Sequence, residues 1–201
     1  MTPILFITAL LLELVYILLF ALTIWRPPFR FWPPPAARSW QFFAAWLMAS
    51  LVFVNFFFVG ILDFDSAFLP DIRARIPAAL ICLIVGTALG MWGGMVFGSR
   101  ATMGLGTRLV TRGPYRYTRN PQYIGDSLNA LGYMLLTNSW LAWVIGLLGI
   151  LLNLMAPLTE EPWLAQRFGQ DYLDYQRRVP RWIGRRTVNI NAKAQSRQNH
   201  L

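Results

Sequence analysis

Five long apolar runs, separated by short polar segments, set the pattern of this chain. They cover roughly residues 4–25, 40–62, 76–98, 121–137 and 139–157, with boundaries good to a few residues. A run of about 20 apolar residues is what an α-helix needs to cross a hydrocarbon core of about 30 Å. The pattern therefore predicts an all-α integral membrane protein with about five transmembrane helices.

The connection between the fourth and fifth runs is very short. It consists of Thr137, Asn138 and Ser139, which is too short for a domain linker and typical of an antiparallel helical hairpin. We expect a single transmembrane domain over residues 1–184, with this hairpin near its C-terminal end. The remaining residues, 185–201, are polar and basic and are expected to form a disordered tail.

Charge alternates from one connection to the next. The first connection holds three arginines and no acid, the second three acids and two arginines, and the third five arginines and no acid. Arginine and lysine are enriched on the cytoplasmic side of membrane proteins. We therefore expect the N-terminus and second connection outside, and the first connection, third connection and C-terminus in the cytoplasm, with a bacterial inner membrane as the expected location.

Composition narrows the function. The chain is 56% hydrophobic and 13% charged, about half the charged fraction of a soluble domain. Its net charge of +9 resides mainly in the connections and tail, so no nucleic-acid partner is expected. The single cysteine, Cys82, lies in an apolar run, and the single histidine is His200. No intrachain disulfide and no metal site are predicted.

The apolar runs contain a few residues that a simple anchor does not need. Glycines recur every four residues in the third run, at Gly86, Gly90, Gly94 and Gly98, which favours close helix packing over contact with a ligand. Acids within membrane helices are functional hypotheses by default. We expect Glu13 to make an interhelical hydrogen bond, whereas Asp126 lies about one turn inside the fourth run, next to the polar motif before it.

That motif reads GPYRYTRNPQYIG, from Gly113 to Gly125. Asn120 is expected to be the N-cap of the fourth helix and Pro121 its first residue. The arginines of the motif fit two interpretations equally, binding of anionic headgroups and binding of a small charged molecule.

A second polar cluster follows the fifth run. Glu160 and Glu161 at a helix C-terminus oppose the helix dipole, so they either pair with the arginines or receive a cationic ligand. Pro162 can break the helix, with a short amphipathic helix expected from Trp163 to Gly169.

The order of these motifs resembles a known family. GPYRYTRNPQYIG, a helical hairpin and then EEPWLAQRFGQDYLDYQRRVPR are similar to the isoprenylcysteine carboxyl methyltransferases and, more widely, to membrane phospholipid methyltransferases. The resemblance covers about residues 104–182. In one place the chain departs from the family, which usually has Arg-His-Pro where this chain has Arg119-Asn120-Pro121. Asparagine can donate a hydrogen bond but cannot exchange a proton near neutral pH.

The resemblance implies S-adenosylmethionine as the cofactor, held at the cytoplasmic end of the hairpin. Carboxylates would accept from the ammonium or ribose, an arginine would meet the carboxylate, and tyrosines would cover the adenine or sulfonium. The cofactor-binding residues implied are Tyr117, Asn120, Pro121, Tyr123, Glu160, Glu161 and Tyr172.

The catalytic residues implied are Arg119, Asp126 and Arg181. Asp126 would be the base for an amine or thiol acceptor, and Arg181 would orient a carboxylate acceptor. The acceptor is expected to be lipid-like or isoprenoid and to enter from the bilayer, with prenylated carboxylates, phospholipid amines, small thiols and quinone-like groups all open. Asp126 also matches a position in NADPH-dependent membrane sterol reductases, which are the alternative, together with an inactive scaffold of the same fold.

Overall fold

The computed structural model describes residues 1–26, 28–67, 69, 71–106 and 108–184; the predicted disordered tail, 185–201, lies outside them. The described residues are helical or irregular and contain no strand, which confirms the all-helical fold class. The helices are α1 (Thr2–Trp25), α2 (Trp40–Leu62), α3 (Ile72–Phe97), α4 (Pro121–Thr137), α5 (Trp140–Phe168) and α6 (Gln170–Arg178). Two short helices, η1 (Ala101–Leu105) and η2 (Gly113–Arg116), lie between α3 and α4.

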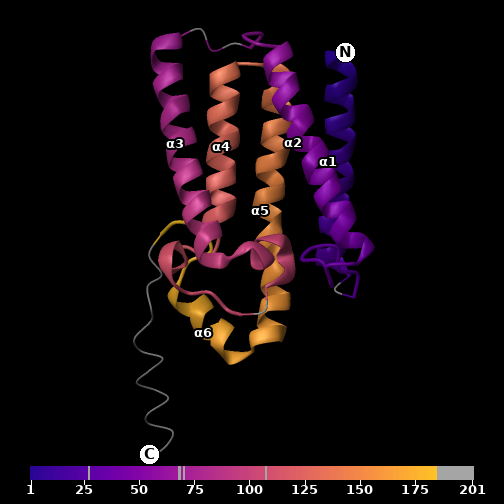
Figure 1. The fold of residues 1–201 in the computed structure, drawn as a ribbon, viewed down its shortest axis with the longest axis vertical. Helices are drawn as coiled ribbons and strands as arrows, with labels where there is room; N and C mark the ends of the chain where they lie inside the picture. Colours follow the sequence, from indigo (N-terminus) through magenta and orange to yellow (C-terminus); the bar gives the residue numbers. More distant parts are fainter. Residues whose placement is uncertain (27, 68, 70, 107, 185–201) are drawn as a thin grey trace, which may run out of the picture.

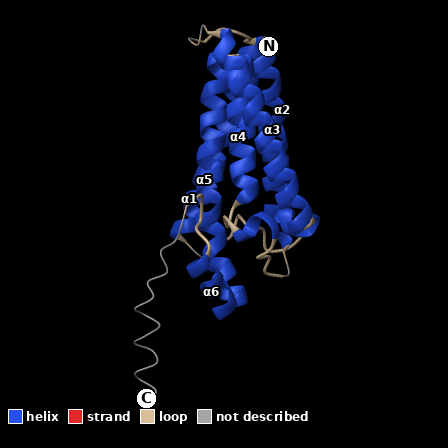
Figure 2. Cartoon of the chain, turned by 90° about the vertical axis from the view of Figure 1, so that its left-hand side faces the viewer, coloured by secondary structure: helices blue, strands red, loops and turns tan. Residues whose placement is uncertain are grey.

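The five long helices lie side by side, and α6 crosses one end of the bundle (Figures 1 and 2). The N-terminus and the connection between α2 and α3 lie at the opposite end (Figure 1). The first and third connections share the end that carries α6. This grouping is the one that the alternating charge predicts, whereas the compartment that each end faces stays a prediction.

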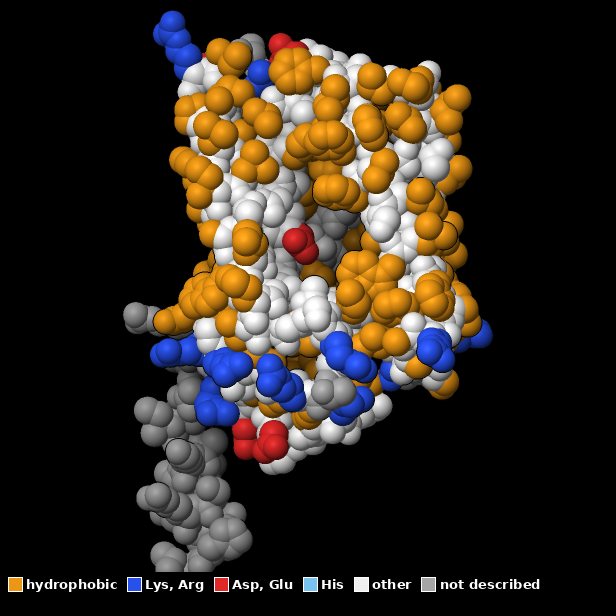
Figure 3. Space-filling view, viewed as in Figure 1, with side chains coloured by type: hydrophobic (Ala, Val, Ile, Leu, Met, Phe, Trp, Pro, Cys, Tyr) orange, Lys and Arg blue, Asp and Glu red, His pale blue; other side chains and the backbone are white. Residues whose placement is uncertain are grey.

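Four helices, α1, α2, α3 and α5, are long and apolar enough to cross a membrane. Their outer surfaces carry large exposed hydrophobic side chains, and basic side chains form a belt near the end that carries α6 (Figure 3). These features are those of an integral membrane protein. The fourth predicted span, α4, has 17 residues, a length of about 26 Å at 1.5 Å per residue, so the count of five spans stays a prediction.

Close contact between α3 and α4 depends on glycine. A Cβ atom built on Gly125 would lie 2.7 Å from both the carbonyl oxygen of Gly86 and the backbone nitrogen of Gly90. Such contacts are shorter than van der Waals distance, so the two backbones approach this closely only without a side chain. The predicted packing role is confirmed for Gly86, although nothing lies within 4 Å of the Cβ position of Gly98.

The helix α5 corrects one prediction. It runs without interruption from Trp140 to Phe168, through Pro157 and Pro162, so Pro162 does not break the helix and Trp163–Gly169 is no separate helix. Proline removes a backbone donor, but packing of the last turns holds the helix together. Leu164, Ala165 and Phe168 pack against a buried cluster of Tyr172, Tyr175 and Val179.

The turn between α4 and α5 is held by acids from the connection between α2 and α3. Asp63 Oδ2 accepts hydrogen bonds from Ser66 Oγ (2.6 Å), Ser139 Oγ (2.7 Å) and the backbone N–H of Leu141 (3.2 Å). Asn138 adopts the left-handed conformation and donates to Asp65 Oδ1 at 2.9 Å. The antiparallel hairpin is therefore confirmed and is fixed by polar contacts far from α6.

Candidate functional site

The arginine-rich motif folds across the α6 end of the bundle and is tied to α6 by Arg119. The Arg119 backbone N–H donates to Pro180 O (3.0 Å), and its Nη1 donates to the carbonyls of Gln176 (3.0 Å) and Val179 (3.1 Å). The last carbonyls of a helix need partners from outside the helix. Arg119 supplies them at the end of α6, so the motif and α6 form one unit.

Glu161 completes this unit from α5. Its Oε1 lies 2.7 Å from Arg119 Nη2, and its Oε2 lies 2.6 Å from Arg181 Nη2. Hydrogen bonding to Glu161 raises the pKa of Arg181 above its ordinary value. Both carboxylate oxygens therefore face arginines, and the ion pairs join the motif, α5 and the segment after α6.

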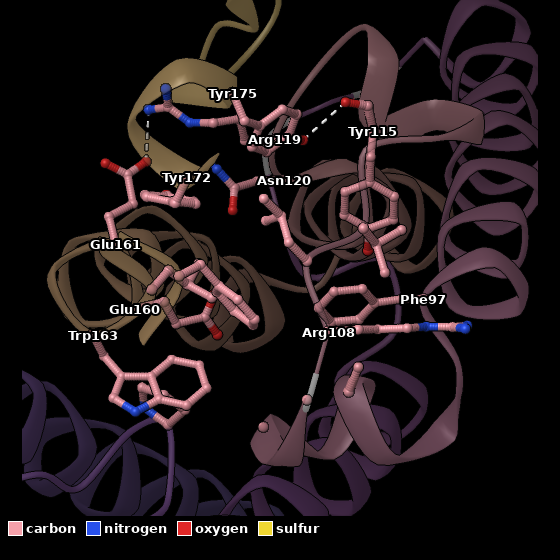
Figure 4. Close-up of a pocket in the computed structure, with 18 residues that line it drawn as sticks. Phe97, Arg108, Tyr115, Arg119, Asn120, Glu160, Glu161, Trp163, Tyr172 and Tyr175 are labelled. Atoms are coloured by element: carbon pink, nitrogen blue, oxygen red, sulfur yellow. Dashed lines mark hydrogen bonds and ion pairs between the residues drawn. The ribbon is translucent and has the colours of Figure 1, made fainter. Parts of the chain in front are cut away.

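Glu160 points elsewhere, as the close-up shows (Figure 4). Its Oε1 accepts hydrogen bonds from Trp32 Nε1 and from the hydroxyl of Tyr123, both at 2.6 Å. These donors come from the first connection and from α4, respectively. No arginine contacts Glu160 in the part of the chain that the structure describes, so the two neighbouring acids have different surroundings.

A pocket opens between these groups, and we call it the polar pocket. It holds about 670 Å³ of space not filled by atoms, some of it open to solvent. Aromatic side chains form much of its wall, with Glu160 and Arg119 among the polar groups that reach it (Figure 4). The aromatic residues that line it are Phe97, Tyr115, Trp163, Phe168, Tyr172 and Tyr175.

Tyrosines of α6 and η2 brace this wall. The Tyr175 hydroxyl donates to the Tyr115 carbonyl at 2.8 Å, and the rings of Tyr172 and Tyr175 meet edge to face at 6.2 Å. Burial raises the pKa of the Tyr172 and Tyr175 phenols, so both stay neutral at physiological pH. The polar pocket thus has neutral aromatic surfaces next to Glu160, an acid that has no arginine partner among the described residues.

Gly104 explains how the first connection reaches the polar pocket. Its φ of +77° is unfavourable for other residues. A Cβ atom there would lie 2.6 Å from Pro34 Cδ and 3.1 Å from the Trp32 ring. A glycine at this position allows η1 to lie against the Trp32 segment.

Two further cavities lead from the polar pocket into the bundle. The middle cavity shares Arg119, Asn120 and Glu160 with the polar pocket, and it shares Tyr123 and Asp126 with the third. The third, which we call the deep cavity, holds about 1550 Å³ including its open side. Figure 3 shows a hollow in the side of the bundle with an acidic side chain exposed in it. Three neighbouring cavities with shared lining residues therefore extend from a polar end to a mainly apolar interior.

The predicted site residues divide into three groups. Arg119, Asn120, Glu160, Glu161 and Tyr172 line the polar pocket, whereas Tyr123 and Asp126 line the middle and deep cavities. Three residues line none of these cavities: Pro121, Tyr117 and Arg181.

The residues outside the cavities have other contacts. Pro121 is the first residue of α4, as predicted. Tyr117 is 64% exposed and lies beside the Arg116 guanidinium. Arg181 donates to both carboxylate oxygens of Glu161, through Nε at 2.9 Å and Nη2 at 2.6 Å. Asn120 is the N-cap residue of α4, but its side chain makes no cap hydrogen bond and donates to the Arg181 carbonyl at 3.0 Å. Its side chain therefore fixes the segment after α6.

The sequence did not reveal Trp32. In the proline-rich first connection, Phe31 and Trp32 are buried, and Trp32 contacts Glu160. Trp163 was also missed as a pocket residue, because its ring reaches the pocket only through the continuation of α5. No pattern of neighbouring residues in the sequence predicts contacts between segments that lie far apart along the chain.

Comparison with known proteins agrees with this arrangement. The family model described as phospholipid methyltransferase matches residues 74–171, from α3 to the first turn of α6. No curated protein and no solved structure matches the chain. The matched segment contains the motif, the hairpin and the acidic pair. The match over residues 74–171 therefore confirms the resemblance of this chain to membrane methyltransferases.

Proposed function

We propose that the protein is an S-adenosylmethionine-dependent methyltransferase that acts on a lipid-like acceptor from the bilayer. The observation that carries this proposal is the series of three cavities. The polar pocket suits a charged, adenine-bearing cofactor, and the deep cavity suits an apolar chain. Both meet at the middle cavity, where Glu160 and Asp126 line the wall.

The residues of the polar pocket fit this cofactor. Tyr172, Tyr175 and Trp163 offer ring faces and edges to adenine or to a sulfonium, and Glu160 offers a carboxylate to an ammonium or ribose hydroxyl. The Arg119 Nε–H is buried and has no partner in the described part of the chain. A donor that lacks a partner is costly to bury, and a carboxylate of the cofactor would satisfy it.

The acids then have separate functions. Glu161, paired with Arg119 and Arg181, holds the pocket together, and Glu160 contacts the cofactor. When bound, the cofactor supplies an activated methyl group. The protein contributes alignment and exclusion of water, which are the main sources of catalysis in a displacement.

Asp126 lines the passage between the middle and deep cavities. It is therefore placed to take a proton from an amine or thiol acceptor. A carboxylate acceptor would need an orienting cation that is free to meet it. Arg181 lines none of the three cavities, and Arg119, which lines the middle cavity, is already paired with Glu161. The described residues that line the deep cavity include no lysine or arginine. The arrangement therefore favours an amine or thiol over a carboxylate.

Calorimetry on the purified protein in a neutral detergent tests the proposal. We expect S-adenosylmethionine and its demethylated product, S-adenosylhomocysteine, to bind. NADPH should not bind, because the polar pocket presents an acid and no unpaired cluster of arginines. Binding of NADPH without either sulfur ligand would favour the reductase, and binding of none would favour an inactive scaffold.

A further inference from the structure

The deep cavity is mainly apolar, but its lining includes two acids and several neutral polar side chains, among them Thr87, Asn129 and Asn153. Residues of α1 to α5 surround it, and its charged residues are Glu13 and Asp126, with no lysine or arginine. The space inside it that a small molecule can reach is about 580 Å³, within the roughly 300–1,000 Å³ of most small-molecule sites. The cavity therefore has room for a long chain and nothing in its lining that would neutralise an anion.

Glu13 is the unexplained member of this lining. It lies in the middle of α1, its side chain is 0% exposed, and neither carboxylate oxygen has a hydrogen-bond partner among the described residues. The predicted interhelical hydrogen bond is therefore wrong. Burying a carboxyl group without a hydrogen-bond partner is energetically costly. Intramembrane acids are retained where they face a pathway or a ligand.

The depth of Glu13 can be read from its neighbour on α5. Its Oε1 lies 3.5 Å from the Cβ position of Gly149. One turn closer to the polar pocket on the same helix, Asn153 Nδ2 donates to Ser127 Oγ of α4 at 3.1 Å, next to Asp126 in the sequence. Four residues of helix span about 6 Å. Glu13 therefore lies on the order of 6 Å deeper in the bundle than the level of Asp126.

We propose that Glu13 is a second, deeper polar contact for the lipid-like acceptor, and that it accepts a hydrogen bond from a hydroxyl or amine N–H within the part of the acceptor that enters the bundle. The inference rests on the proposed function and goes beyond it by naming the acceptor's chemistry. A carboxyl oxygen accepts hydrogen bonds whether or not the group is protonated. A plain acyl chain would leave Glu13 unpartnered, so the cavity selects a chain that carries a donor.

Binding of simple amphiphiles tests this inference without requiring turnover. The probes are 1-hexadecanol and a series of hexadecanediols whose second hydroxyl moves along the chain. A change in tryptophan fluorescence on addition of the probe reports binding to the protein in a neutral detergent, since Trp32 lines the deep cavity. We expect one or two diols to bind two- to tenfold more tightly than 1-hexadecanol, the gain of a single neutral hydrogen bond.

Variants show whether Glu13 is the residue that causes the tighter binding of a diol. Glu13→Gln retains a carbonyl oxygen and should keep the preference for the diol, whereas Glu13→Leu should abolish it and leave the affinity for 1-hexadecanol unchanged or higher. Thr87→Val removes a hydroxyl from the α3 wall of the same cavity and should keep the preference. Three results would overturn the inference. The preference for a diol over 1-hexadecanol could be lost equally in Thr87→Val, or it could persist in Glu13→Leu. The wild-type protein could also bind all diols with the same affinity.

Calorimetry with S-adenosylhomocysteine on the same samples separates this inference from the proposed function. The cofactor should bind wild type and Glu13→Leu equally, because Glu13 lies outside the polar pocket. A wild-type protein that distinguishes diols through Glu13 but binds no cofactor would contradict the proposed function alone. Normal cofactor binding without any effect of Glu13 on diol affinity would contradict this inference alone.

Discussion

At the scale of single residues, the acidic pair shows how adjacent side chains acquire different functions. Glu160 and Glu161 follow each other on α5, so their side chains point about 100° apart around the helix. Glu161 meets two arginines, and Glu160 meets an indole and a phenol. Charge neutralisation therefore occurs at Glu161, whereas Glu160 keeps a carboxylate at the junction of two cavities.

This difference predicts opposite defects in two matched variants. Glu161→Gln leaves the buried Arg119 without its anion, and removal of one partner from a buried pair costs on the order of 3–5 kcal/mol. Glu160→Gln should leave stability nearly unchanged but weaken S-adenosylhomocysteine binding roughly ten- to a hundredfold, the loss of a charge-assisted hydrogen bond. Thermal unfolding and calorimetry in detergent measure the two effects. The reverse assignment of defects would mean that Glu161 contacts the cofactor.

At the scale of elements, the hairpin and its partners explain the rigidity of the site. Residues that start α4 and end α5 form the cavities, so the angle between α3, α4 and α5 fixes their size. Gly86 and Gly125 set the α3–α4 approach, and Asp63 fixes the turn at the other end of α4 and α5. Contacts near the two ends of α4 therefore position the helices that line the cavities.

A glycine pair tests the helix contact. Gly125→Ala forces a methyl group to within 2.7 Å of two backbone atoms of α3, so we expect a loss of about 1–3 kcal/mol from overpacking. Gly90→Ala is the control, because the nearest atom to its Cβ position is Asp126 Oδ1 at 4.0 Å. Thermal unfolding of both variants in detergent checks the contrast. Equal unfolding temperatures for the two variants would contradict the close approach of the α3 and α4 backbones at Gly125.

The turn predicts a response to acid. Burial alone raises the pKa of Asp63, but hydrogen bonds from Ser66, Ser139 and Leu141 outweigh it and leave that pKa below its ordinary value. A carboxyl group with a lowered pKa in the folded state stabilises the protein above its unfolded pKa, and this contribution is lost as the pH falls through the folded pKa. Thermal unfolding from pH 7 to pH 3 should show this loss. Asp63→Asn should be less stable at pH 7 and less sensitive to acid; an unaltered pH profile would count against the contribution of Asp63.

At the scale of the whole molecule, the hydrophobic pattern was sufficient to predict the bundle. Four of the five expected spans are long apolar helices, and α4 starts at Pro121 as expected, because hydropathy, proline and short polar turns act locally. The course of α5 past Pro162 could not be predicted, since packing with Tyr172 and Tyr175 overrides the local effect of proline.

The site was less accessible to prediction than the fold. The acidic pair, Arg119 and Tyr123 were found because the motifs that carry them are polar or follow the order of a known family. Trp32 was missed because its contact with Glu160 joins residues 128 positions apart, and no pattern in the first connection specifies that partner. The pairing of Arg181 with Glu161 likewise depends on the path of the chain after α6.

The orientation in the membrane follows from charge and can be measured directly. Reporter fusions at Ser66, in the connection between α2 and α3, and after Leu201 should report opposite sides, with the C-terminus in the cytoplasm. Addition of four lysines next to Ser66 should weaken the preference for the orientation that places the C-terminus in the cytoplasm. Fusions that report the same side would show that α4 does not cross the membrane.

Transfer of a labelled methyl group tests the central claim most directly. Purified protein is incubated with S-adenosylmethionine labelled in the methyl group and with membrane lipids, and the lipids are extracted and counted. The account predicts label in a lipid of the extract, strongly reduced by Glu160→Gln. Removal of the base by Asp126→Asn should also reduce it if the acceptor is an amine or thiol. No label in any lipid, from a folded protein that binds the cofactor, would contradict methyl transfer to a lipid-like acceptor.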